Sequence, residues 1–383
     1  MKKVLFIGDP NTGHTERFLR NLVGFSSDIE IDLLCDYHCS ELGNVALYCN
    51  NIFNNNFCSP KVLYRLPKIN SYLIKRDYLS ALSNIPKRYY DIVNVHFVGI
   101  NTYYANNDLH RIAKKVLLTP YGSDVLRATS SGLKLLQHVY DTADGVTLSP
   151  VREHGFYVKV KEIFSLPESK IYEAGFGSDA IDRMLEDGHS QKEAKEGLGI
   201  ADRYVITIGY NGSPGQQHVK VIDAIIKVKD RLPSNLTILI PATYPSNNES
   251  YLRTLIAKME ENDIHYRIIN HFLSLDELVQ LRKCADMFIH AQTTDASCAS
   301  IMEYMLTDAV IVNGSWLSYP ELERDGMPYI SFSNFDELGE KVLEASAQQS
   351  LVSLELKNYL SKRGWKEEIK YWTRCYSKLI NEC

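Results

Sequence analysis

The 383-residue sequence lacks most of the features that would assign a protein to a class at once. Its eight cysteines are scattered and form no CxxC pair, so we expect reduced thiols, no zinc site and a cytoplasmic protein. No apolar run approaches the roughly 20 residues that span a bilayer. The apolar N-terminal stretch is interrupted by Asp9 and Pro10 and is interpreted as a first buried strand. A net charge of −5 disfavours wholesale nucleic-acid binding.

Neither a GxGxxG nor a P-loop pattern is present, and there is no short-period repeat. What the sequence has is an alternation of short apolar runs with helical patterns. Such an alternation predicts βαβ units and parallel sheets whose strands are covered on both faces. The expected strands are 3–8, 30–35, 90–99, 114–122 and 144–150, then 204–209, 236–242, 265–271, 285–291 and 309–314.

The restart of this pattern near residue 200 predicts two domains, as the chain length also suggests. We expect a Rossmann-like domain over 1–180, a linker over 181–202 and a second Rossmann-like domain over 203–355. The tail 356–383 is helical, with a break at Gly364, and is expected to cross back to the first domain. Two doubly wound domains that face each other form a cleft beyond the carboxyl ends of their strands.

A glycine-rich turn follows the first strand of the second domain, in the stretch IGYNGSPGQQHVK. Free backbone N–H groups and the start of a helix predict an anion site there, with phosphate as the favoured ligand. The alternative is an ordinary tight strand–helix turn. Asn211, Gly212, Ser213, His218 and Lys220 are the candidate donor-binding residues of this loop.

Two carboxylates, Asp295 and Glu303, lie eight positions apart around the start of a later helix. The first-turn amides between them, including those of Ser297, Ala299 and Ser300, are expected to receive a diphosphate. Glu303 is then placed for ribose hydroxyls and Asp295 for the hydroxyls of an attached sugar. The alternative is helix capping by Asp295 and a solvated Glu303.

These residues resemble the E-x7-E element of retaining glycosyltransferases of family 4, with aspartate in place of the first glutamate. Other stretches resemble further landmarks of that family in the same order: GDPNTGHTERFLRNL, VNVHFVG, TPYGSDV and EAGFGSDAI. A second resemblance is local. The stretch 241–251 matches the pattern PxxYPxNNExY of the inverting transferases that add 4-acetamido-4,6-dideoxygalactose to the lipid-linked precursor of enterobacterial common antigen. Both resemblances imply the GT-B fold, and they disagree on stereochemistry.

The resemblance to family 4 implies a metal-independent enzyme with a nucleotide-sugar on the second domain and the acceptor on the first. Asp295 is implied at the donor sugar and Glu303 at the ribose, while Gly13 and His14 approach the phosphate. Loops 241–247, with Tyr244, and 313–319, with Trp316, are expected to select the donor. The arginine and lysine that family 4 enzymes usually carry in the phosphate loop are absent, and Lys220 is the nearest positive charge.

Three further features keep two interpretations each. His96 ends a strand. It either contacts the donor sugar or is a structural histidine whose hydrogen bonds are made within the protein. Asp124 is an acceptor-side base or a helix N-cap. The segment 60–79 interleaves basic and apolar residues; it lies on an anionic membrane surface or packs on its own domain.

The sequence thus predicts a GT-B glycosyltransferase that moves a sugar from a UDP-, GDP- or dTDP-linked donor, with no further cofactor. The acceptor is expected to be a saccharide or lipid-linked saccharide in bacterial surface polysaccharide synthesis, and the configuration is expected to be retained. Three alternatives stay open: an inverting GT-B transferase, a non-catalytic GT-B partner subunit and a nucleotide-sugar epimerase. The predicted location is cytoplasmic, with a possible peripheral position at the inner membrane face.

Overall fold

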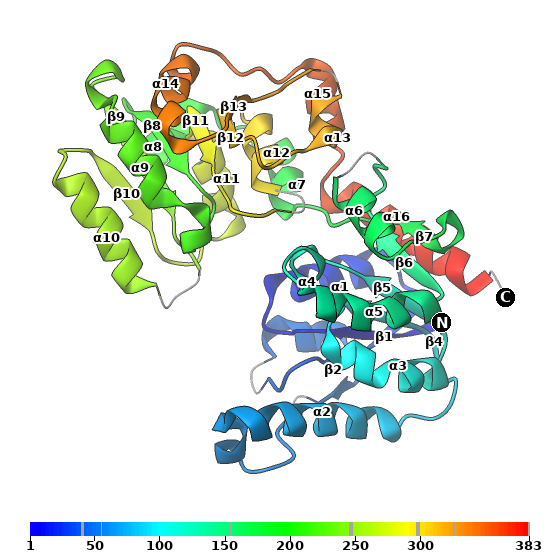
Figure 1. The fold of residues 1–383 in the computed structure, drawn as a ribbon. Coiled ribbons are helices and arrows are strands. Elements are labelled where there is room, and N and C mark those ends of the chain that lie inside the picture. Colours follow the sequence, from blue (N-terminus) through cyan, green and yellow to red (C-terminus); the bar gives the residue numbers. More distant parts are fainter. Residues whose placement is uncertain are drawn as a thin grey trace. The chain divides into compact units, whose positions relative to one another are not determined.

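The computed structural model describes residues 1–39, 42–54, 56–152, 155–244, 248–295, 299–324 and 326–381. The chain divides into two compact units. Unit 1 comprises Met1–Gly177 together with Trp365–Cys383, and unit 2 comprises Ser178–Gly364. Each unit is an α/β layer structure in which helices cover both faces of one parallel sheet (Figure 1).

Unit 1 contains a seven-stranded sheet in the order β3-β2-β1-β4-β5-β6-β7. Its strands are β1 (Lys2–Gly8), β2 (Ile29–Cys35), β3 (Ile52–Phe53), β4 (Tyr90–His96), β5 (Ala113–Thr119), β6 (Gly145–Leu148) and β7 (Ile171–Glu173). Its α-helices are α1 (Gly13–Phe25), α2 (Pro67–Ser83), α3 (Ile100–Ile112), α4 (Ser123–Leu126), α5 (Ser130–Thr142), α6 (Gly155–Ile163) and α16 (Trp365–Asn381). Short 3-10 helices are η1 (Gly43–Tyr48), η2 (Lys61–Arg65) and η3 (Glu168–Lys170).

Unit 2 contains a six-stranded sheet in the order β10-β9-β8-β11-β12-β13. Its strands are β8 (Tyr204–Ile208), β9 (Leu236–Pro241), β10 (Tyr266–Ile269), β11 (Met287–His290), β12 (Val310–Gly314) and β13 (Ile330–Phe332). Its α-helices are α7 (Asp179–Glu186), α8 (Gln191–Gly197), α9 (His218–Ile226), α10 (Glu249–Glu260), α11 (Leu275–Lys283), α12 (Ala299–Leu306), α13 (Pro320–Glu323), α14 (Phe335–Ser346) and α15 (Leu354–Leu360). The 3-10 helices are η4 (Pro214–Gln216) and η5 (Lys229–Arg231).

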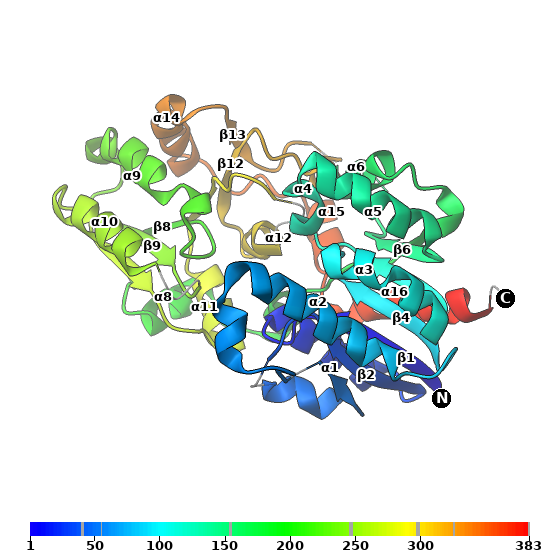
Figure 2. The same ribbon diagram turned by 60° about the horizontal axis from the view of Figure 1, so that its bottom comes forward.

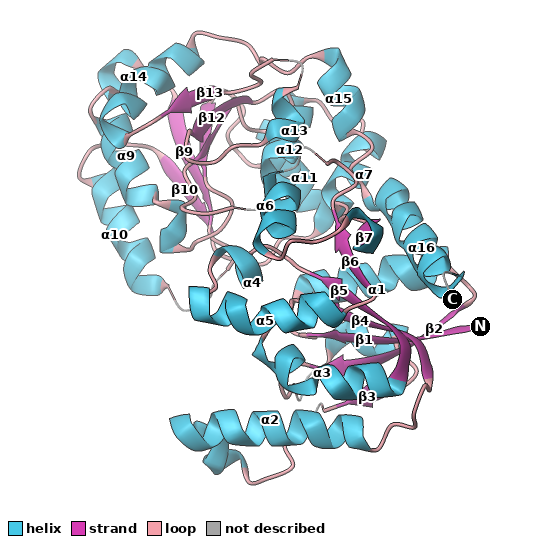
Figure 3. Ribbon diagram, turned by 45° about the vertical axis from the view of Figure 1, so that its right-hand side comes forward, coloured by secondary structure: helices cyan, strands magenta, loops and turns pink. Residues whose placement is uncertain are grey.

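The sheets are covered on both faces because their strands are apolar on both sides. In β1, Leu5 and Ile7 pack into the core beneath α2, α3 and α5, whereas Val4 and Phe6 pack against α1 and α16. Figure 3 shows the strands of each sheet side by side between helices. This two-sided burial explains the continuous apolar runs in the sequence, which a half-exposed sheet does not need.

The last helix of the chain, α16, belongs to unit 1, where it lies beside α1 (Figure 2). Trp372 is fully buried there and its indole N–H donates to the carbonyl of Gly175, with an N–O distance of 2.7 Å. The break before α16 occurs at Gly364. A Cβ at this position would lie 2.1 Å from a carboxylate oxygen of Asp182, so a larger residue would require that side chain to move.

The structure bears on two expectations, reduced cysteines and the lack of a membrane-spanning segment. No disulfide joins the cysteines that the structure describes. Among those same residues, no helix is both long and apolar enough to cross a membrane.

Candidate functional site

Unit 2 has a topological switch point between β8 and β11. The chain runs from β8 outward to β9 and β10 on one side, and then returns to β11, β12 and β13 on the other. Loops that leave such a point diverge to opposite faces of the sheet and leave a crevice at the carboxyl ends of the strands, where open α/β sheets bind ligands. The loops after β8 and β11 are therefore the place to look for a site.

The loop after β8 makes a sharp turn before α9. Gly209 has a φ of 64°, and a Cβ there would lie 2.8 Å from Oε1 of Gln216, so any other residue would be strained at this position. The amides expected to meet phosphate already have partners. The N–H of Gly212 donates to the carbonyl of Tyr244 at 2.8 Å, and that of Ser213 to Oδ1 of Asn211 at 2.9 Å.

His218 and Lys220 begin α9 but occupy different surroundings. His218 is fully buried, and burial lowers its pKa to about 4, so the ring is neutral near pH 7. Its Nδ1 lies 3.3 Å from the hydroxyl of Tyr251. Lys220 is exposed; it donates to Oε1 of Gln217 at 2.9 Å and lies 5.0 Å from the centre of the Phe335 ring.

The loops after β8 and β11 are tied together. The N–H of Thr293 donates to the carbonyl of Gly215 at 3.0 Å. The amide of Gln217 donates to the carbonyl of Ala291 at 2.8 Å. These contacts hold the end of β11 against the turn, so polar groups from both loops share one region of unit 2.

Buried polar atoms in this region have no hydrogen-bond partner among the described residues. They include Nε2 of Gln216, Nε2 of His218, Oε1 of Gln292 and Nε2 of His290. A buried polar atom without a partner costs about 1–3 kcal/mol, so native proteins usually pair such atoms with water or a ligand. Their presence on both sides of the switch point indicates a site for a polar molecule.

Asp295 follows β11 and is mostly buried. Its Oδ2 accepts a hydrogen bond from the hydroxyl of Tyr319 at 3.0 Å and lies 3.7 Å from Nε2 of His290. The other ring nitrogen of His290 bonds Oδ1 of Asn313 at 2.9 Å and therefore carries the proton in the neutral ring. Burial lowers the pKa of His290, although Asp295 and Asn313 oppose the effect. Two hydrogen-bond acceptors, Nε2 of His290 and Oδ2 of Asp295, thus face each other. A sugar hydroxyl could donate its proton to Asp295.

Glu303 is buried in α12 and does not lie on a solvated face. Its Oε2 accepts from Nε of Arg282 at 2.8 Å and its Oε1 from the hydroxyl of Ser178 at 2.7 Å. Arg282 also donates to the hydroxyls of Tyr304 and Ser300, at 3.0 and 3.1 Å. A ribose would have to use the remaining lone pairs of Glu303, so its predicted contact with the donor competes with a structural role.

The other predicted donor residues of unit 2 lie at its periphery. Ala299 is exposed at the start of α12, whereas Ser297 lies outside the described residues. Tyr244 is 54% exposed, just before another stretch that is not described. Trp316 is 39% exposed, and its indole N–H donates to the carbonyl of Gln292 at 2.8 Å. Trp316 therefore combines a partly open ring with an anchor on the β11 loop.

The predicted residues of unit 1 gather at the carboxyl ends of β1, β4 and β5. His14 is exposed and meets the ring of Tyr121 edge-on, with centroids 5.8 Å apart. Gly13 opens α1, and the guanidinium of Arg17 lies 3.7 Å from where its Cβ would be.

His96 is only 1% exposed. Its ring nitrogens lie 3.0 Å from the hydroxyl of Tyr121 and 3.0 Å from the amide of Asn94. Burial holds its pKa well below the usual value. Both ring nitrogens of His96 therefore have partners within unit 1.

Asp124 is buried inside α4 and does not cap that helix. Its carboxylate accepts the backbone N–H groups of Val98, Tyr121 and Gly122 at 2.8–3.2 Å. Burial raises its pKa, and these hydrogen bonds counter the rise. The expected N-cap is corrected accordingly: Asp124 joins the loops after β4 and β5. Each of its oxygens already has backbone donors, which leaves it poorly suited to act as a base.

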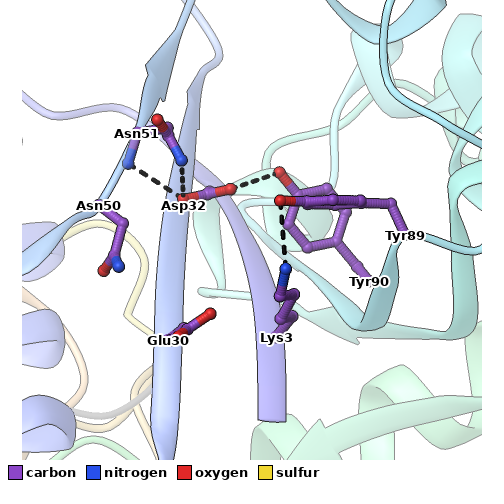
Figure 4. Close-up of a pocket in the computed structure, with 7 residues that line it drawn as sticks. All are labelled: Lys3, Glu30, Asp32, Asn50, Asn51, Tyr89 and Tyr90. Carbon is purple, nitrogen blue, oxygen red and sulfur yellow. Dashed lines mark hydrogen bonds between the residues drawn. The ribbon is translucent and has the colours of Figure 1, made fainter. Parts of the chain in front are cut away.

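A small pocket lies at the opposite edge of the unit 1 sheet, at the amino ends of β1, β2 and β4 (Figure 4). Asp32 is saturated there. It accepts from the backbone and side-chain N–H groups of Asn51, at 3.0 and 2.9 Å, and from the hydroxyl of Tyr90 at 2.7 Å. Parallel sheets bind ligands at the carboxyl ends of their strands and not at these amino ends. The hydrogen bonds join β2 to β4 and to the residue that precedes β3.

Known structures share this architecture over the whole chain. A structure of HepE from Anabaena in complex with UDP has a TM-score of 0.70 and 13% identity, covering 99% of this chain and 100% of that one. Sucrose-phosphate synthase from Thermosynechococcus elongatus has a TM-score of 0.70 and 10% identity, with full coverage of both chains. A glycosyltransferase from Rickettsia africae has a TM-score of 0.67 and 14% identity, covering 100% and 99%.

The fold is GT-B. The expected fold class, two Rossmann-like parallel-sheet domains, is confirmed. HepE has also been crystallised with UDP-glucose. No family model matches the sequence, and no curated protein sequence matches it.

Several residues of the site were not singled out from the sequence. Arg282 lies in a helix whose charged residues look solvated, and only the tertiary structure pairs it with Glu303. His290, Gln216 and Gln292 are strand-end or turn residues, and their position just beyond a predicted strand was the available signal.

Proposed function

We propose that the protein is a cytoplasmic, metal-independent glycosyltransferase with a nucleotide-sugar donor. The donor is UDP-, GDP- or dTDP-linked, and the acceptor is a saccharide or lipid-linked saccharide of a bacterial surface polysaccharide. The observation that carries the proposal is the set of unpartnered buried polar groups at the unit 2 switch point, on a GT-B fold. The UDP and UDP-glucose complexes of HepE support the donor class.

Each site residue has a proposed task. Asp295 accepts hydroxyls of the donor sugar, and the hydroxyl of Tyr319 fixes its orientation. Nε2 of Gln216 donates to the diphosphate. On binding, the diphosphate oxygens replace the Tyr244 carbonyl and Oδ1 of Asn211 as acceptors for the backbone N–H groups of Gly212 and Ser213. Glu303 meets the ribose while its pairing with Arg282 persists. Oriented donors at the leaving diphosphate stabilise charge where it develops.

Retention of configuration is proposed because Asp295 and Glu303 resemble the E-x7-E element of the retaining transferases of family 4. The acceptor is proposed to bind unit 1, beyond the carboxyl ends of its strands. The anomeric configuration of the product, followed by proton NMR during the reaction, distinguishes retention from inversion.

The test begins with a thermal-shift screen across UDP-, GDP-, dTDP- and CMP-sugars. We expect one base to raise the melting temperature by several degrees, because a ligand that binds only the folded state stabilises it. Asp295→Asn should keep nucleotide binding and lose transfer, whereas Asp336→Asn, at a side chain 94% exposed in unit 2, should behave as wild type. Failure of every nucleotide and nucleotide-sugar to bind would refute the proposal.

A non-catalytic GT-B subunit is the second candidate function. It is favoured by the phosphate loop, whose Gly212 and Ser213 amides are occupied and whose nearest lysine is bound to Gln217. This alternative predicts no donor hydrolysis or transfer by the purified chain, even at saturating nucleotide-sugar. Slow donor hydrolysis that Asp295→Asn abolishes would exclude it.

A further inference from the structure

Helix α2 and the preceding 3-10 helix η2 have one buried and one exposed side. Towards the unit 1 core, Tyr64, Leu73 and Tyr78 are at most 9% exposed. The outward side is also apolar, which is unusual for a helix at the margin of a domain. Its exposed side chains are Val62 at 64%, Leu66 at 47%, Ile69 at 42% and Tyr72 at 66%.

Positive charges accompany this apolar stripe. Lys61 and Arg65 are exposed beside it, and Lys75 lies 3.6 Å from the centre of the Tyr104 ring on α3. No acidic residue occurs between Lys61 and Arg76, although the whole chain has a net charge of −5. The next acid, Asp77, is buried and paired with Arg76. We call this surface the basic apolar face: Lys61, Val62, Arg65, Leu66, Ile69, Tyr72 and Lys75.

The shape of the face restricts what can bind it. Figure 3 shows α2 at the margin of unit 1, with α3 along only one of its sides. Ile69, Tyr72 and Arg76 follow one another at helical spacing on the outward side of α2. A helical face of this kind suits a broad interface that accepts apolar tips and offers negative charge.

We propose that the basic apolar face docks on a lipid bilayer with anionic headgroups. The apolar tips enter the interfacial region, where tyrosine is favoured, and the lysine and arginine side chains reach lipid phosphates. The inference goes beyond the proposed function and does not rest on it, because no residue of the face belongs to the donor site in unit 2.

The test measures co-sedimentation of the full chain with vesicles of phosphatidylcholine alone or mixed with phosphatidylglycerol. We expect binding to the mixed vesicles only, weakened by salt. Each basic side chain near an anionic surface contributes about fivefold to partitioning, so Lys61→Glu with Arg65→Glu should lower binding at least 25-fold. Ile69→Ser with Tyr72→Ser should lower it about tenfold.

Matched pairs elsewhere serve as controls. Lys192→Glu with Lys227→Glu changes two exposed lysines of unit 2, with side chains 80% and 62% exposed. Phe272→Ser with Leu354→Ser removes two apolar side chains that are 80% and 69% exposed. Both controls should bind vesicles as wild type does.

Three results would overturn the inference: no binding of the wild type to anionic vesicles, equal binding to neutral vesicles, or equal losses in the control pairs. The face variants should melt at the wild-type temperature, because their side chains point outward. They should also keep any donor-induced thermal shift. Loss of vesicle binding with an intact thermal shift therefore separates this inference from the proposed function.

Discussion

Replacing Glu303 by glutamine measures how far this carboxylate serves the fold. Arg282 is 4% exposed and Glu303 is 5% exposed, and the pair is joined at 2.8 Å. The pKa of Arg282 is raised, because its neighbours Tyr304 and Glu303 outweigh the effect of burial. The substitution keeps the shape of the side chain but leaves the guanidinium without a countercharge.

Removing one partner of a buried ion pair costs about 3–5 kcal/mol. For a unit of this size each kcal/mol lowers the melting temperature by about 2–4 °C, so Glu303→Gln should lower that of unit 2 by about 6–20 °C. The lower end is expected, because the amide oxygen of the glutamine still accepts a hydrogen bond. Calorimetry is the appropriate assay, since the two units can give separate transitions.

Two further variants complete the test. Arg282→Met combined with Glu303→Leu removes both charges and should recover most of the loss, because apolar replacement of a whole buried pair is often neutral. Glu340→Gln breaks the exposed pair with Arg231 and should leave the melting temperature unchanged. The reasoning fails if Glu303→Gln melts within about 2 °C of wild type. Such a variant that has also lost donor affinity would identify Glu303 as a ligand residue alone.

Three other predictions follow from single sites. Gly209→Ala should destabilise unit 2 by about 1–2 kcal/mol because of its positive φ and abolish donor-induced stabilisation, whereas Gly24→Ala, with open space around it in α1, should be neutral or stabilising in the same melts. Burial and the nearby Asp9 raise the pKa of Asp36 from 3.8 to about 7, against a bond from Asn101. The folded state thus holds this proton longer than the unfolded state, so the stability of the wild type relative to Asp36→Asn, measured in urea titrations, should fall between about pH 4 and 7, by at most about 4 kcal/mol. A stability difference that does not change with pH would contradict this prediction. Donor binding should quench tryptophan fluorescence, and Trp316→Phe should remove that quench, because the other two tryptophans belong to unit 1 and are at most 2% exposed. A quench that persists in the variant contradicts the assignment of Trp316 to the donor site.

Much of the fold follows from local patterns in the sequence. Every strand expected from an apolar run is present, because strands buried on both faces need continuous apolar residues. The strands β3, β7 and β13 were not expected, since each has only two or three residues and takes its structure from pairing with a neighbour. The break at Gly364 was expected, and the structure places this residue between α15 and α16.

The candidate site was predictable in place but not in detail. Glycines and polar residues just after strands mark the carboxyl ends of a parallel sheet, so the loops 209–218 and 290–299 could be named in advance. The hydrogen-bond partners of the loop residues could not be predicted, because they depend on which loops contact each other in the folded chain. The amides of Gly212 and Ser213 looked free in the sequence, yet Tyr244 and Asn211 occupy them.

The sequence by itself determined the alternation of elements, the two-unit plan and the loops that surround each switch point, because these depend on periodicity and chain connectivity. Only the tertiary structure decided which charges are buried and paired. The sequence favours a ribose contact for Glu303 over a solvated position, and only the structure shows that α11 brings Arg282 to within 2.8 Å of it. The difference arises because burial and pairing are properties of elements far apart in the chain, whereas strand and helix patterns are properties of neighbours.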